Sequence, residues 1–193
     1  MITKEAARYD RFLWFLEVLA FRNLRRRLLS GVSEDILEIG IGTGANLPFY
    51  PESAIVTAID PRPGLLHGIQ GKSSIETRIC CADAIHLPFG DNSFQTIVST
   101  LVFCSVTDVP AGLQEVWRLL KPGGKLLMLE HVRGRTPFTR RLTDLFNPAW
   151  YAMQKECNLN RETEESVREA GFTIHRSSLH GHGMLLLLDA RKE

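Results

Sequence analysis

Short apolar runs alternate with helical patterns along most of the chain. Apolar runs bounded by turn-forming residues are typical of strands that are buried on both faces of a sheet. The predicted strands are the run from Ile36 to the first glycine, Ala54–Ile59, Ile75–Cys80, Gln95–Thr100, Lys125–Glu130, Phe172–Ser178 and Met184–Asp189. The predicted helices lie near Ala45–Tyr50, Leu65–Gln70, Pro110–Leu120, Thr136–Tyr151 and Arg161–Ala170.

This alternation predicts an α/β protein with a mostly parallel sheet and helices on both faces. The last two strands differ from the others, because a short loop containing His180–Gly183 joins them without a helix. Strands joined in this way pair antiparallel. The 193 residues suit one domain, which we divide into a helical lid at residues 1–30 and a core at residues 31–193.

The first thirty residues combine an apolar helical stretch, from Phe12 to Leu24, with arginines at Arg22 and Arg25–Arg27. The uncharged apolar part is shorter than the ~20 residues that are needed to span a bilayer. Three interpretations of residues 9–29 stay open: a lid packed on the domain, a helix in a membrane interface, or a dimer surface. We favour the lid, with peripheral membrane contact as the second interpretation.

The junction between the first predicted strand and its loop carries the clearest chemical signal. Gly40, Gly42 and Gly44 alternate with other residues directly after a buried strand. Glycine adopts positive φ and lets a ligand approach the backbone closely. The N–H groups at the start of the following helix then face that ligand. Glu38, at the end of the strand, is expected to face a cationic ligand rather than a pyrophosphate.

Acidic residues follow three successive predicted strands, at Glu38, Asp60 and Asp83. In an open parallel sheet, ligands bind at the carboxyl ends of the strands, near the switch point of the strand order. We expect Asp60 to accept both hydroxyls of a ribose. We expect Asp83 to accept an exocyclic amine and the N–H of Ala84 to donate to an adenine ring nitrogen. Leu65 is expected to supply an apolar wall for that ring.

The glycine motif alone leaves other functions open. Gly40, Gly42 and Ala45, followed by Asp60, also fit a loose dinucleotide-binding fingerprint. A nicotinamide-dependent oxidoreductase would need a second nucleotide-binding half or catalytic Tyr/Lys chemistry, and the chain length and closing strand pair argue against it. A non-catalytic nucleotide-binding protein would keep the pocket and block the acceptor side. Both classes stay as alternatives.

Charge, cysteine content and the N-terminal sequence indicate which partners and which cellular compartment to expect. A formal net charge of +1, from 23 basic and 22 acidic residues, gives no electrostatic reason to expect nucleic acid. Cys80, Cys81, Cys104 and Cys157 show no C-x-x-C or Cys/His spacing, so we expect no metal site and buried free thiols. Nothing resembles a cleavable signal peptide, which predicts a cytoplasmic protein. The oligomeric state is not indicated.

Four segments, taken in order, resemble the class I S-adenosylmethionine-dependent methyltransferases. They are ILEIGIGTGANL, AIDPRPGLL, CADAIHLPFGDNSFQTIVSTLVFCSV and LQEVWRLLKPGGKLLMLEH, which cover most of residues 36–131. The resemblance implies a Rossmann-like seven-stranded sheet with an antiparallel last strand, and S-adenosyl-L-methionine as cofactor. Within the class, the chain is similar to quinone C-methyltransferases, bacterial phospholipid N-methyltransferases and alkyl-thiol methyltransferases. The segment NPAWYAMQKECNLNRETEESVREAGF resembles the last two groups.

The resemblance also implies which residues contact the cofactor. The three glycines approach its methionine part, Asp60 holds the ribose, and Asp83 reads the adenine. Thr100 and Leu101 face the sulfonium, and Tyr9 stands where related enzymes place a lid tyrosine. The full predicted set for the cofactor is Tyr9, Glu38, Gly40, Gly42, Gly44, Asn46, Asp60, Pro61, Leu65, Asp83, Ala84, Thr100 and Leu101.

The expected reaction is in-line methyl transfer to an N, S or C nucleophile of a small or lipid-like acceptor, and positioning supplies most of the catalysis. By chain position, His131 is best placed to act as a base, if the acceptor must lose a proton. A histidine that is simply hydrogen-bonded at a strand end is the competing interpretation. Phe103, Cys104, Trp150 and Cys157 are expected to line the acceptor pocket, which favours an apolar or soft acceptor.

Overall fold

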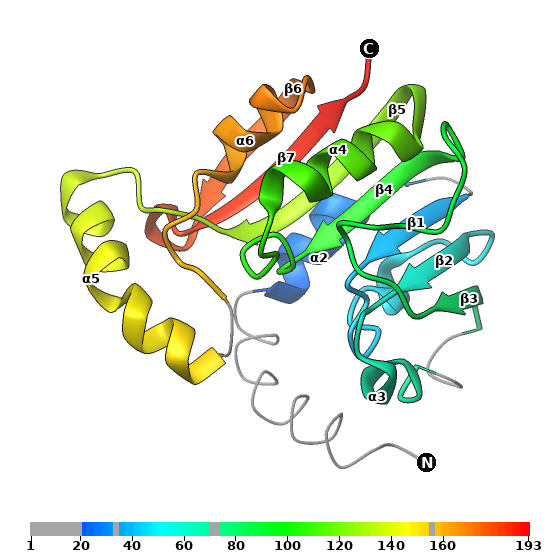
Figure 1. The fold of residues 1–193 in the computed structure, drawn as a ribbon, viewed down its shortest axis with the longest axis horizontal. Coiled ribbons are helices and arrows are strands. Elements are labelled where there is room, and N and C mark those ends of the chain that lie inside the picture. Colours follow the sequence, from blue (N-terminus) through cyan, green and yellow to red (C-terminus); the bar gives the residue numbers. More distant parts are fainter. Residues whose placement is uncertain (1–20, 33–34, 70–73, 155–156) are drawn as a thin grey trace.

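A seven-stranded sheet forms the centre of the computed structural model, which describes residues 21–32, 35–69, 74–154 and 157–193 (Figure 1). The strand order is β3-β2-β1-β4-β5-β7-β6. The strands are β1 (Ile36–Ile39), β2 (Ile55–Ile59), β3 (Glu76–Cys80), β4 (Phe94–Thr100), β5 (Leu120–His131), β6 (Thr173–His180) and β7 (Leu185–Arg191).

Strand directions confirm the predicted α/β class with its Rossmann-like, mostly parallel sheet. β1 pairs in parallel with β2 and β4, β2 with β3, and β4 with β5. β7 runs antiparallel to both of its neighbours, β5 and β6. The carboxyl ends of β1 to β5 therefore meet at one edge, and the strand order reverses between β1 and β4.

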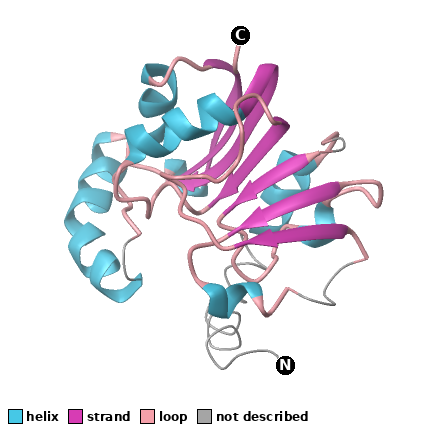
Figure 2. Cartoon of the chain, turned by 45° about the vertical axis from the view of Figure 1, so that its right-hand side comes forward, coloured by secondary structure: helices cyan, strands magenta, loops and turns pink. Residues whose placement is uncertain are grey.

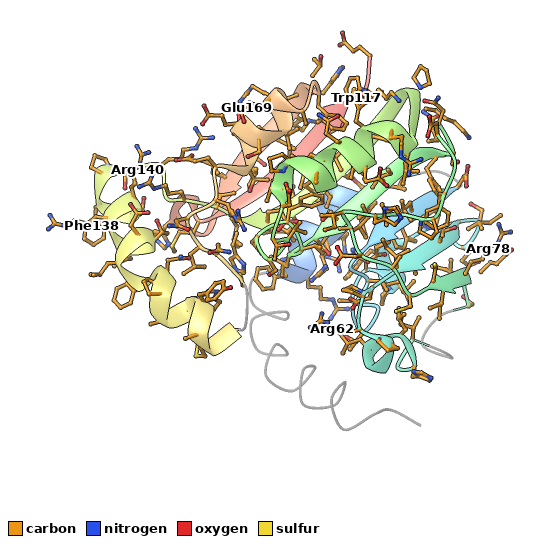
Figure 3. The ribbon with its side chains drawn as sticks, viewed as in Figure 1. Arg62, Arg78, Trp117, Phe138, Arg140 and Glu169 are labelled. Carbon is orange, nitrogen blue, oxygen red and sulfur yellow. The ribbon has the colours of Figure 1, made fainter. Side chains whose placement is uncertain are left out.

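Helices cover both faces of the sheet (Figure 2). α4 and α6 pack on one face together with Leu37 of β1, whereas α2 packs on the other face together with Ile36. α5 lies to one side, and its Phe138 is 75% exposed and points away from the sheet (Figures 1 and 3). The helices are α2 (Arg22–Leu29), α3 (Pro63–Leu66), α4 (Val109–Leu119), α5 (Pro137–Gln154) and α6 (Thr163–Glu169), with 3-10 turns at Leu47–Phe49 and Gly181–Gly183.

Only the end of the predicted N-terminal lid falls within the described residues. α2 contacts β5 and β7 and buries Leu24, Arg25, Leu28 and Leu29. Residues 1–20, with Tyr9 among them, lie outside the described part, so the lid, membrane and dimer interpretations stay predictions there. Among the described helices, none combines the length and the apolar character that crossing a membrane requires. Cytoplasmic localisation stays a prediction.

Two predicted element boundaries differ from the structure, one because of a proline and one because of sheet pairing. The helix predicted at Ala45–Tyr50 is a single 3-10 turn, because Pro48 lacks the N–H that a longer helix would use. β5 begins earlier than predicted, since Leu120 already pairs with Phe94. The next pair along is Thr96 with Lys125, so the intervening residues of β5 form a bulge between the two.

Candidate functional site

The glycine loop after β1, which contains Gly40, Gly42 and Gly44, packs against protein at Gly40 and borders open space at Gly42. Gly40 has φ +66°, and an added Cβ would collide with the side chain of Val102, which follows β4. Gly42 has φ +56°, and an added Cβ there would meet no described atom within 4 Å. Because L-residues rarely adopt these backbone angles, both positions favour glycine. The loop therefore packs on the end of β4 at Gly40 and leaves space beside Gly42.

Asp60 joins this loop to the end of β2. Its Oδ2 atom accepts a hydrogen bond from the Gly42 N–H at 3.1 Å. Its Oδ1 atom accepts from the N–H of Arg62 at 2.9 Å and from Arg62 Nε at 3.3 Å. The Asp60 residue is 1% exposed, whereas the Arg62 side chain is 52% exposed and lies beside α3 (Figure 3). The structure thus brings together Gly42 and Asp60, which the sequence predicted as neighbours.

A buried polar network lies beneath the loop. Asn46 Nδ2 donates to Glu38 Oε1 at 2.9 Å, and the Tyr50 hydroxyl donates to Glu38 Oε2 at 2.7 Å. Arg25 Nη1 donates to Asn46 Oδ1 at 2.8 Å and to Thr100 Oγ1 at 2.6 Å. These bonds connect α2, the glycine loop and the ends of β1 and β4. Such a network fixes the loop because each buried polar group has a partner.

The Glu38 carboxylate is buried and hydrogen-bonded to protein side chains, which its sequence context did not indicate. Burial raises its pKa to about 7, against the hydrogen bonds from Tyr50 and Asn46 and the charge of Arg25. Glu38 was expected to face a cationic ligand, but both of its oxygens accept from protein side chains. Its contact with the cofactor stays a prediction. Sequence reasoning missed Arg25, although it falls four residues after the buried Phe21 on the apolar face of the helix.

The residues predicted to bind adenine follow β2 and β3. Asp83 is exposed, and its Oδ1 atom accepts from the N–H of Ile85 at 3.2 Å. Ala84 is 7% exposed and Leu65 is 1% exposed, so Leu65 offers almost no surface for the expected ring wall. Pro61 is exposed directly after Asp60. The contacts of these residues with adenine stay predictions.

The turn after β4 is held by a carboxylate that the sequence analysis did not identify. Glu130 is fully buried near the end of β5, and its oxygens accept from the N–H groups of Val102, Phe103 and Cys104 at 3.0–3.2 Å. Burial raises the pKa of Glu130. Leu101 begins this turn with φ +59°, a conformation that costs a non-glycine residue about 1–3 kcal/mol. Glu130 therefore stabilises a strained turn that carries Cys104.

Three predicted acceptor-side residues meet at the ends of β4 and β5. Cys157 Sγ lies 3.4 Å from Cys104 Sγ and 3.5 Å from His131 Nδ1, and Cys104 Sγ lies 3.9 Å from the same nitrogen. The His131 ring contacts the rings of Phe21 and Trp150 edge-on, each at a centroid distance of 6.0 Å. Phe103, in contrast, is 1% exposed and belongs to the core under α4, so a pocket-lining role for it stays a prediction.

A hydrogen bond between the thiols of Cys104 and Cys157 shifts the pKa values of both groups. The hydrogen bond with Cys104 lowers the pKa of the Cys157 thiol to about 4 against the effect of burial, and the His131 ring acts in the same direction as that hydrogen bond. The same hydrogen bond, together with burial, raises the pKa of Cys104. Cys157 is therefore the more acidic thiol of the pair.

Backbone contacts explain how Cys157 reaches Cys104, 53 residues away in the chain. The Asn158 N–H donates to the Cys104 carbonyl at 2.8 Å, and Asn158 Nδ2 donates to the same oxygen at 3.2 Å. Arg161 Nη2 donates to the Val106 carbonyl at 2.9 Å. The sequence spacing gave no reason to expect a metal site, yet the structure gathers three ligand-type atoms within 4.8 Å of one another.

Comparisons with known proteins identify the family and the fold. Residues 37–128 match the family described as a methyltransferase domain. Over 165 residues, the chain is 33% identical to human thiol S-methyltransferase TMT1A, covering 77% of this chain and 67% of that protein. The chain belongs to the class I S-adenosylmethionine-dependent methyltransferases. This methyltransferase is also 34% identical over 110 residues to demethylmenaquinone methyltransferase of Corynebacterium urealyticum, covering 56% of this chain and 46% of that protein.

The fold comparison extends over nearly the whole methyltransferase. An S-adenosylmethionine-dependent methyltransferase of Thermotoga maritima superposes with a TM-score of 0.73 at 20% identity, covering 97% of this chain and 96% of that one. The chain spans 63–67% of the length of the human and rodent thiol S-methyltransferases that it matches. The likeness in structure shows the fold, and the likeness in sequence shows the family.

The residues present fit S-adenosylmethionine, the cofactor of this family. An added Cβ at Gly42 would meet no described atom within 4 Å, so the backbone of the loop borders open space that a ligand could occupy. The carboxylate of Asp60 lies next to it, and a carboxylate is an acceptor suited to ribose hydroxyls. Both features lie at the carboxyl edge of the parallel strands, beside the point where the strand order reverses.

Proposed function

We propose that this methyltransferase transfers the methyl group of S-adenosylmethionine to the sulfur of a small thiol. The observation that supports this acceptor most directly is the cluster of Cys104, His131 and Cys157 beside the turn after β4. The cluster combines soft sulfur atoms with an imidazole, in contact with the aromatic rings of Phe21 and Trp150. Such surroundings suit a soft, weakly hydrated nucleophile. The relatives named thiol S-methyltransferases support the same acceptor class.

On the cofactor side, the glycine loop and Asp60 would hold S-adenosylmethionine, with Asp83 and Ala84 beside the adenine. When bound, the cofactor supplies an electrophilic methyl group on a sulfonium. The protein's part is to fix the two reactants, and the polar network of Arg25 and Asn46 fixes the loop for that purpose. His131 belongs to the acceptor side, where its Nδ1 atom faces both thiols.

The first test of this function is an acceptor screen with a labelled methyl donor. The enzyme is incubated with small alkyl thiols, a reduced naphthoquinone and an ethanolamine lipid, and products are identified by mass spectrometry. We expect labelled thioethers from the thiols. Labelled quinol or lipid without any thioether would refute the thiol assignment and favour a carbon or nitrogen acceptor, the former in line with the demethylmenaquinone methyltransferase relatives.

The cofactor site is tested with two matched glycine substitutions. Gly42→Ala and Gly31→Ala both place alanine at positive φ, and neither added Cβ meets a described atom within 4 Å. The cost in stability should therefore be similar, about 1–2 kcal/mol each. Calorimetry should show weaker S-adenosylmethionine binding only for Gly42→Ala, since Gly31 lies outside the site. Equal affinity in the two variants would contradict the assignment of Gly42.

A further inference from the structure

The side chains of Cys104, His131 and Cys157 form a triangle of potential metal ligands. Its sides, between Sγ and Nδ1 atoms, are 3.4, 3.5 and 3.9 Å. Around a tetrahedral zinc ion, bonds of about 2.3 Å to sulfur and about 2.0 Å to nitrogen place ligand atoms roughly 3.5–3.8 Å apart. The triangle therefore has nearly the size of one face of a zinc coordination tetrahedron.

We propose that these three side chains bind a zinc ion whose fourth position takes the sulfur of the acceptor thiol. The proposal rests on the thiol acceptor proposed above. Two thiolates and one imidazole form a ligand set that prefers zinc to magnesium or calcium, which prefer oxygen. Structural zinc sites have four protein ligands, whereas catalytic sites have three and leave one position open. Three ligand residues at the acceptor side thus match the catalytic type.

Neighbouring groups hold Cys104 and His131 in place. The N–H of Cys104 donates to Glu130 Oε2 at 3.2 Å, and the carbonyl of Cys104 accepts two hydrogen bonds from Asn158. The ring of His131 is confined by its edge-on contacts with Phe21 and Trp150. Ligands that are fixed in this way by their surroundings bind a metal without a large ordering cost.

Trp150 lies beside the cluster and contacts two of its members. Its ring contacts the His131 ring edge-on, and its side chain donates a hydrogen bond to the sulfur of Cys157. A donor in this position helps to fix the Cys157 sulfur, as the surroundings of metal ligands commonly do.

The site would give the acceptor thiol its reactivity. A thiol that coordinates a divalent cation loses its proton, here to solvent, and remains nucleophilic as a thiolate. A lone pair of its sulfur forms the new bond to the methyl carbon while the bond from that carbon to the sulfonium breaks. The products are a neutral thioether and S-adenosylhomocysteine. His131 then acts as a ligand, and no separate base is needed.

Metal content and cobalt spectroscopy test this site without relying on activity. The full chain is purified without oxygen or chelator, and zinc is measured by mass spectrometry, with an expected content on the order of one ion per chain. Cys104→Ser and Cys157→Ser should lose the zinc. Cys80→Ser is the matched control, because Cys80 lies in β3 and outside the cluster, and it should keep the zinc.

Cobalt exchange makes the result independent of how well the variants fold. Wild-type protein, stripped and reloaded with Co²⁺, should show thiolate-to-cobalt charge-transfer absorption that shifts when a small alkyl thiol is added. Protein that takes up neither metal, or a cobalt spectrum that thiols leave unchanged, would overturn the proposal. Zinc-free enzyme that still methylates thiols at the full rate would also overturn it and leave the proposed function standing. A thiol-responsive cobalt spectrum without thioether formation would support the site and refute the proposed function.

Discussion

Glu38 makes the stability of the protein depend on pH in a direction unusual for a carboxylate. Burial raises its pKa from 4.5 to about 7, so the folded state binds the proton more tightly than the unfolded chain does. The stability that this proton contributes is present below pH 4.5 and is lost as the pH rises through about 7. The difference between the two pKa values corresponds to about 3 kcal/mol in the free energy of unfolding.

Glu38→Gln isolates this contribution. The amide oxygen can still accept from Asn46, and the amide NH₂ can donate to the Tyr50 hydroxyl, as a protonated carboxyl would. We expect the variant to gain about 2–3 kcal/mol relative to wild type between pH 5 and pH 8. Urea unfolding at several pH values measures this, and taking the difference between the two proteins removes the contribution of all other titrating groups.

The exposed Glu52 provides the control. Glu52→Gln should stay within about 0.5 kcal/mol of wild type at every pH, as expected for a surface substitution. If the difference between Glu38→Gln and wild type is the same at pH 5 and pH 8, the carboxylate is already ionised in the folded state across this range. The reasoning from burial would then be wrong.

Three further substitutions probe the loop and the turn beside it. Asp60→Ala should weaken S-adenosylmethionine binding by about 1–3 kcal/mol in calorimetry, the cost of losing a buried polar partner, and an unchanged affinity would exclude Asp60 from the site. Gly40→Ala should lower stability by about 2–4 kcal/mol in thermal unfolding, more than Gly42→Ala, because its Cβ collides with Val102; equal losses would contradict this packing. Glu130→Gln leaves at least one buried N–H of the Cys104 turn facing an amide NH₂, so urea unfolding should show a loss of about 1–3 kcal/mol, and a wild-type value would contradict that role.

The fold was predictable because its signals are local. All four residues of β1 are buried, and apart from Glu38 the strand is apolar, as expected for a strand that is buried on both faces. The closing pair β6 and β7 was predictable because only a short loop joins them. The start of β5 was not, since Leu120 extends the strand only through its pairing with Phe94, and no local pattern encodes that partner.

The contact between Gly42 and Asp60 was predictable from strand order, whereas the positions of other buried polar residues depend on tertiary contacts. Gly42 and Asp60 each directly follow a recognisable strand, so their meeting could be inferred. Arg25 and Glu130 are charged residues, which are rarely fully buried, and only the folded chain shows the partners that they satisfy. The metal-type cluster joins residues that are 26, 27 and 53 positions apart, so no short motif reveals it.

The bonds from Arg25 to Asn46 and Thr100 have an energetic consequence at the start of the chain. These hydrogen bonds couple the position of α2 on the sheet to the ordering of the glycine loop. Linkage makes such coupling reciprocal: any molecule that gains affinity from an ordered loop also holds α2 in place. Any contact that stabilises the position of α2 raises the affinity for that molecule by the same factor, so α2 contributes to affinity without touching the molecule.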